Sequence, residues 1–80
     1  MERKIYKGVV VEMEKDEEYA KSKWRFVPDA FPKQRLRLTE AHQGVGNFWT
    51  MEIDLKPYAK KGIKVEGFND SEWVWMAEII

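Results

Sequence analysis

Six basic side chains in the first half of the chain have the spacing of an anion-binding face. They alternate with other residues along two consecutive runs, and alternate residues of an extended strand point to the same side. If the two runs pair antiparallel, all six side chains lie on one face, which would bind phosphate groups through counterion release. Two nearby aromatic residues, Tyr19 and Phe31, are candidates for stacking on the bases of a single strand. The six basic residues are Lys21, Lys23, Arg25, Lys33, Arg35 and Arg37.

The same alternation is typical of any half-exposed strand, so the basic face also has a purely structural interpretation. Between Tyr19 and Thr39 the only acidic residue is Asp29, but Glu52 and Asp54 on a neighbouring run could neutralise the arginines. The whole chain has 14 basic and 14 acidic residues, so it has no overall attraction to a polyanion. Nucleic-acid binding is therefore an alternative function rather than the leading one.

The run over residues 72–80 is apolar on both of its faces. A strand of this kind must be covered on both sides, or it will associate with other chains. Tryptophan and methionine are enriched in the cores of protein interfaces. We therefore expect a homo-oligomer or a protein partner, bound through Trp73, Val74, Trp75 and Met76. The alternative is that these side chains fill the interior of the domain.

Three of the four tryptophans, Trp24, Trp49 and Trp73, suggest a third kind of site, an aromatic pocket for a small molecule. A glycine-rich segment, HQGVGN at residues 42–47, has two glycines that could expose amide groups to an anion. It lacks the spacing of a phosphate-binding loop, and no lysine follows it. The segment therefore predicts the turn of a hairpin.

The side chains of an enzyme are scarce. His42 is the only histidine and there is no cysteine, so the usual zinc sites cannot be assembled. Ser22 and Ser71 are the only serines, and neither stands in a nucleophile motif. We expect a protein that is not an enzyme and that carries neither a cofactor nor a metal.

The elements that must position these residues are short strands within one domain of 80 residues. Apolar residues alternate with polar ones between clusters of turn-forming residues, which predicts strands. In the fourth run we expect Trp49, Met51, Ile53 and Leu55 to point inward, and Gly8 to mark a bulge or a close backbone approach. Residues 14–23 leave a helix open as an alternative. The predicted strands cover residues 5–13, 19–27, 34–40, 48–55, 63–66 and 72–80.

The sequence also bears on the surroundings of the protein. It contains no window of about 18 apolar residues, so we expect no membrane span. The first residues, MERKIYKG, lack the apolar stretch of a secretory signal. Together with the absence of cysteine, these features favour a cytoplasmic location.

The stretch LKPYAKKGIKVEG at residues 55–67 resembles the part of small OB-fold proteins in which a short turn or helix leads into the last two strands. The opening IYKGVVVEM is similar to the first OB strand, where a glycine lets the strand curl. The resemblance implies a barrel that binds an oligonucleotide or oligosaccharide across its second and third strands. SH3-like barrels are an alternative.

These observations predict one all-β domain over residues 1–80, a small antiparallel barrel or bent sheet of five or six strands. The leading functional expectation is a non-catalytic binding or protein-interaction module that associates with itself through its last strand. The alternatives are nucleic-acid binding by the basic face and small-molecule binding in a tryptophan-lined pocket.

Overall fold

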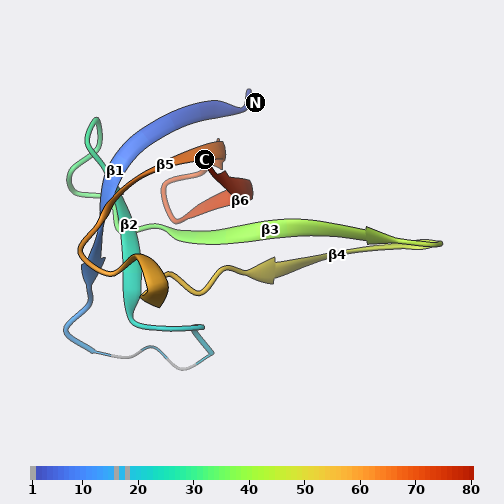
Figure 1. Cartoon of the computed structure of the whole chain (residues 1–80), viewed down its shortest axis with the longest axis horizontal. Coiled ribbons are helices and arrows are strands. Elements are labelled where there is room, and N and C mark those ends of the chain that lie inside the picture. Colours follow the sequence, from blue (N-terminus) through green and yellow to red (C-terminus); the bar gives the residue numbers. More distant parts are fainter. Residues whose placement is uncertain (1, 16, 18) are drawn as a thin grey trace.

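The computed structural model describes residues 2–15, 17 and 19–80. They form one curled sheet of six strands with a single turn of 3-10 helix (Figure 1). Every predicted run contributes a strand, so the prediction of a small all-β barrel or bent sheet is confirmed. The elements are β1 (Lys4–Glu12), β2 (Trp24–Pro28), β3 (Arg37–Gly44), β4 (Asn47–Glu52), η1 (Lys56–Tyr58), β5 (Gly62–Asn69) and β6 (Trp73–Ile79).

The sheet curls until its ends approach each other. Its strand order is β2-β1-β5-β6-β3-β4, and the amide and carbonyl groups of Phe26 and Leu36 exchange two hydrogen bonds of 2.9 Å. This single bridge links β2 to the residue before β3. Strands β2, β1, β5, β6 and β3 therefore surround one core, while β4 lies outside them.

One pairing departs from the predicted antiparallel pattern. Strands β3 and β6 run parallel, with Arg37 opposite Trp73 and Leu38 opposite Val74. Parallel neighbours need a long crossover connection, and β4, η1 and β5 provide it here. The sheet is therefore mixed.

The core is apolar and receives side chains from β1, β2, β3, β5 and β6. Gly8 lies where β1 changes partner, opposite Pro28 of β2 and Ile63 of β5. A Cβ atom at Gly8 would lie 2.1 Å from the carbonyl oxygen of Val27, so the predicted close approach of the backbone is confirmed. The buried core residues are Val10, Phe26, Leu36, Leu38, Leu55, Val65, Val74 and Ala77.

A bulge in β6 explains why that strand is apolar on both faces. Its register with β5 shifts between Glu66 and Phe68, and Met76 has a φ of 52°. The extra residue reverses the alternation, so Val74 before the bulge and Ala77 after it both point into the core. Val74 is thus a core residue and is not available to the interface predicted for this strand.

Strands β3 and β4 form an arm that projects from the barrel (Figure 1). Its turn is shorter than the predicted loop, because β3 continues to Gly44 and β4 begins at Asn47. The prediction that Trp49 and Met51 point inward is wrong, since both are exposed on the arm. Only the end of that run reaches the core, where Leu55 is buried.

The connection between β1 and β2 is longer than predicted. Strand β2 begins only at Trp24, and Tyr19 adopts a φ of 71°, which no strand accommodates. The described residues of the 14–23 segment are not helical; Asp16 and Glu18 lie outside the described residues. Within the described part of the chain, no helix is long and apolar enough to cross a membrane.

Candidate functional site

Strand β2, the start of β3 and the loops that precede β2 and β6 border a hollow of about 220 Å³. Three arginines line it, from both runs of the predicted basic face. The bridge between Phe26 and Leu36 holds these runs together in the antiparallel sense that the sequence predicted. We call this feature the arginine–tryptophan hollow. Its lining residues are Met13, Glu17, Arg25, Arg35, Arg37, Ser71, Glu72 and Trp73.

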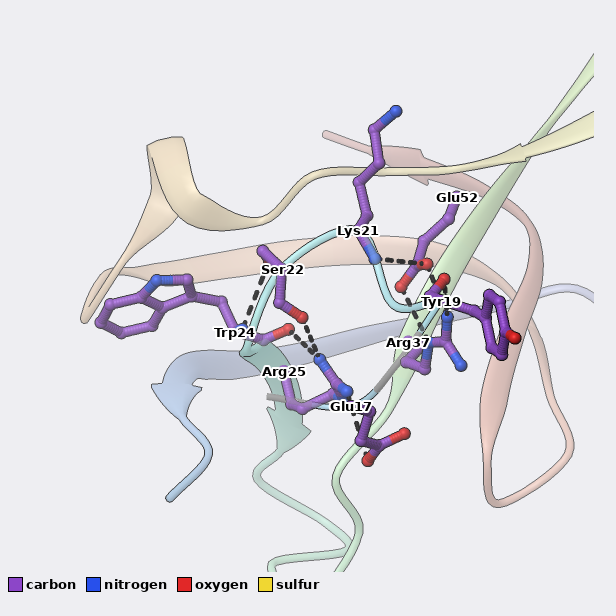
Figure 2. A network of polar contacts seen from close by, with 8 residues as sticks. All are labelled: Glu17, Tyr19, Lys21, Ser22, Trp24, Arg25, Arg37 and Glu52. Carbon is purple, nitrogen blue, oxygen red and sulfur yellow. Dashed lines mark hydrogen bonds and ion pairs between the residues drawn. The ribbon is translucent and has the colours of Figure 1, made fainter. Parts of the chain in front are cut away.

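Arg25 does not belong to an exposed face, contrary to the prediction. It is only 1% exposed, and its Nη1 donates to the carbonyl oxygens of Ser22 at 2.7 Å and Trp24 at 3.0 Å. Its Nη2 lies 3.3 Å from Oε1 of Glu17 (Figure 2). Glu17 and Ser22, in the loop that joins β1 to β2, therefore lie against this guanidinium, which holds the loop to β2.

Arg37, on the wall of the hollow, forms a two-point ion pair with Glu52 of β4. Nε and Nη2 of Arg37 donate to the two carboxylate oxygens of Glu52, the first at 2.8 Å. The amide of Lys21 donates to Glu52 at 2.9 Å, and the carbonyl of Tyr19 accepts from Arg37 at 3.4 Å (Figure 2). The predicted neutralisation by Glu52 is confirmed, whereas Asp54 accepts from the amide of Lys56.

Two stacked tryptophans extend the wall of the hollow along β6. The guanidinium of Arg37 lies 4.2 Å above the Trp73 ring, and the rings of Trp73 and Trp75 are 5.4 Å apart at an angle of 30°. Nε1 of Trp75 donates to Asp70 at 2.6 Å, which fixes the outer ring. Trp75 remains exposed, so the stack ends in an open aromatic surface.

Tyr19 lies beside the same hollow. Its side chain is 91% exposed, although its backbone is held through the hydrogen bond to Arg37. Lys21 is exposed in the same loop. Arg35 is exposed at the rim, where its Nη1 donates to the carbonyls of Pro32 and Gln34. Tyr19 and Arg35 are thus the accessible side chains of the predicted face beside the hollow, whereas the side chain of Lys21 points away from the arginines (Figure 2).

The remaining residues of the predicted face lie elsewhere. Lys23 pairs with Glu12 of β1 at 3.1 Å. Lys33 and Phe31 lie in the connection between β2 and β3, where they border a different hollow, and the Phe31 ring faces Tyr6 at 6.5 Å. The structure therefore divides the predicted face into parts and gathers only its arginines.

The predicted tryptophan pocket is not assembled. Trp24 packs against the core, and Trp73 lies under Arg37. Trp49 stands opposite His42 on the arm, five residues along β3 from Arg37, which amounts to about 16 Å of strand. Of the predicted interface residues, Trp75 and Met76 are exposed and Trp73 is partly covered.

The sequence did not point to the loop residues Glu17, Ser71 and Glu72. Asp70 lies between two predicted strands, and its side chain accepts from the amides of Glu72 and Trp73 at 2.9 and 2.7 Å. Local turn signals, however, do not indicate which strands a loop will approach. Only the closure of the barrel brings this turn opposite β2.

Hydrogen bonds control the ionisation of two carboxyl groups here. Burial acts to raise the pKa of Glu52, but the hydrogen bonds from Arg37 and the Lys21 amide outweigh it and hold the pKa below its ordinary value of 4.5. Burial opposes the shift at Asp70 too, yet its bonds from Trp75 and the loop amides lower its pKa. The hydrogen-bonded ion pair with Glu52 raises the pKa of Arg37.

These shifts make stability depend on pH in the acid range. A carboxyl group whose pKa is lower in the folded chain stabilises the fold above its ordinary pKa, and this contribution disappears as pH falls through the folded pKa. We expect the Tm to hold down to about pH 5 and to fall below about pH 4.5. Thermal melts of the chain and of Glu52→Gln check this. The variant should have a lower Tm at neutral pH, and its Tm should fall less steeply as the pH is lowered. If the Tm of both chains falls equally steeply with pH, the dependence does not come from Glu52.

The walls of the hollow carry three arginines and Trp73 together with the carboxylates of Glu17 and Glu72. Among residues 2–15, 17 and 19–80, no three His, Cys, Asp or Glu side chains are grouped to hold a metal ion. Comparison with protein-family models, with curated proteins and with solved structures found no match to this chain.

Proposed function

We propose that this chain is a non-catalytic OB-type binding domain that binds single-stranded nucleic acid across the arginine–tryptophan hollow. The observation that carries the proposal is the arrangement of Arg35 and Arg37 beside the stacked pair Trp73–Trp75. A single strand needs cations for its phosphate groups and, beside them, aromatic rings for its planar bases.

The strand arrangement supports the OB assignment. The third barrel strand, β3, runs parallel to the last strand, and β5 lies between β1 and β6, as in a Greek-key OB barrel. The turn at η1 leads into β5 as the resemblance implied. The hollow lies across β2 and β3, between the loop that joins β1 to β2 and the loop that joins β5 to β6. OB domains bind their ligands at this place.

The size of the hollow favours a chain over an enclosed small molecule. Its volume of about 220 Å³ lies below the range of roughly 300–1,000 Å³ that is usual for small-molecule pockets. A single strand needs to place only one base at a time against Trp75 or Tyr19, while its backbone passes Arg35. Every base has a flat face, so such stacking tolerates many sequences.

The charge of the hollow limits the expected affinity. Glu17 and Glu52 pair with Arg25 and Arg37, which leaves Arg35 as the remaining arginine of the lining that can meet a bound backbone. Each phosphate contact on a single strand contributes a salt slope of about −0.7. We therefore expect a shallow salt dependence and an affinity that rests largely on stacking.

Fluorescence anisotropy with a labelled oligonucleotide of mixed sequence tests the proposal. The single strand should bind and the duplex of the same sequence should not, because a duplex hides its base faces. We expect Tyr19→Ala to weaken binding at least about fivefold, since one stacked base contributes roughly 1–3 kcal/mol, and Arg35→Ala to weaken binding and to reduce the salt slope by about 0.7. Both side chains are exposed, so neither change should alter the fold.

Lys64→Ala is the matched control, because Lys64 is an exposed cation on β5 and does not line the hollow. Its affinity should equal that of the unchanged chain. Failure to bind single strands at low salt, or equal weakening by Lys64→Ala and Arg35→Ala, would exclude this site.

A further inference from the structure

The β3–β4 arm exposes large apolar side chains on both of its faces. Val45 at the tip is fully exposed, and Phe48, Trp49 and Met51 are 60%, 42% and 46% exposed. The four side chains present on the order of 500 Å² to solvent, given about 150–250 Å² for a whole aromatic side chain. An apolar surface of this extent marks an interaction site.

The edge of the arm has none of the usual protection against pairing. Strand β4 is the last strand of the sheet, so within the described part of the chain no strand lies beside its outer backbone groups. Edge strands are normally protected by lysine, proline or an added charge, but residues 47–51 contain no charged residue and no proline. The one charge of β4, Glu52, is held by Arg37.

We infer that β4 pairs antiparallel with β4 of a second copy of this chain, about a two-fold axis at Thr50. Opposite residues of antiparallel strands point to the same face of the sheet. Because both strands are the same segment, two facing residues must both have even numbers or both have odd numbers, so their numbers add to an even total. With the axis at Thr50, Trp49 faces Met51 of the second copy, and this contact occurs twice. The charged residue Glu52 then faces Phe48, so no like charges meet.

The area and the shape of the arm favour a second copy as the occupant. A standard interface takes about 800 Å² from each partner, and the exposed apolar side chains of one arm offer up to about 500 Å² toward it. The same register brings Val45 level with position 55 of the second copy, at the base of its arm. A hollow of about 410 Å³ lies beside that base, lined by Glu40, Ile53, Tyr58, Ala77, Glu78 and Ile79.

A charge exchange at the axis tests the inference. Light scattering should give twice the monomer mass of 9.6 kDa for the unchanged chain. Thr50→Lys and Thr50→Glu each place like charges opposite each other, so each variant alone should be monomeric, with dimerisation weakened by at least about 100-fold. An equal mixture of the two should recover the dimer. Thr50 is exposed, so the fold should be unchanged by circular dichroism.

Two further variants separate this interface from others. Ile5→Lys places a charge at an exposed apolar site on β1 and should leave the dimer intact. Trp75→Glu tests the last strand in the same way. A monomer at every concentration, a mass other than two chains, a dimer abolished by Trp75→Glu but not by the Thr50 changes, or a mixture that stays monomeric would overturn the inference.

Discussion

Gly8→Ala is expected to destabilise the fold strongly, although it adds only one methyl group. The new Cβ would lie 2.1 Å from the carbonyl oxygen of Val27 and 2.8 Å from the ring of Phe26. Neither can yield easily, because Val27 pairs with β1 and Phe26 is wholly buried. We expect a loss of about 3 kcal/mol or more, a large part of the roughly 4–12 kcal/mol available to 80 residues. Urea unfolding followed by tryptophan fluorescence measures it.

Gly62→Ala is the control for this prediction. A Cβ at Gly62 would meet its nearest neighbour, the carbonyl oxygen of Gly8, at an ordinary 3.6 Å. Its φ lies outside the left-handed region, so alanine should be neutral or stabilise the fold by up to about 1 kcal/mol. If both variants unfold at the same urea concentration, the close approach at Gly8 does not limit stability.

Arg25→Leu is the second change with a large expected effect. It would leave the carbonyl oxygens of Ser22 and Trp24 without their donor and Glu17 without its cation. A carbonyl left without its donor away from water costs roughly 1–3 kcal/mol, and Arg25→Leu leaves two, whereas Glu17, with its side chain 53% exposed, is solvated. Because Arg25 also holds the loop that joins β1 to β2, we expect loop amides to exchange hydrogen faster as the urea midpoint falls.

Arg35→Leu makes the same chemical change at the rim of the hollow. Arg35 is exposed, and among the described residues it bonds only to carbonyls of its own loop, so the expected change in unfolding free energy is within about 0.5 kcal/mol. A similar loss in both arginine variants would mean that general charge balance, and not the buried contacts of Arg25, stabilises the fold.

The alternation of apolar residues was sufficient to predict the strands and the class of fold, because pleating places alternate side chains on opposite faces. It could not reveal the bulge at Met76, since one residue of left-handed backbone has no signature in side-chain type. The pattern consequently predicted a strand that is apolar on both faces. In the structure β6 has a single core face, to which Val74 contributes before the bulge and Ala77 after it.

The site was predictable only in part for a related reason. Alternation predicted that Arg25 and Arg37 would project together, but the burial of Arg25 depends on a loop that folds over it from outside the strand. Likewise, Trp49 and Met51 have the spacing of inward residues. An exposed arm and a buried strand share that spacing, and only the ring of β2, β1, β5, β6 and β3 shows which strand is left outside.

The connectivity of this ring of strands also determines which strand pairings form first during folding. The arm joins neighbours in sequence through a two-residue turn, and hairpins of this kind form in about 1–10 μs. The ring instead pairs Lys4 with Gly67 and Arg37 with Trp73, and such distant pairings slow folding to the range of milliseconds to seconds. The apolar arm is thus presented to other chains during much of the search for the native state. Refolding at high protein concentration will bring intermolecular pairing into competition with barrel closure.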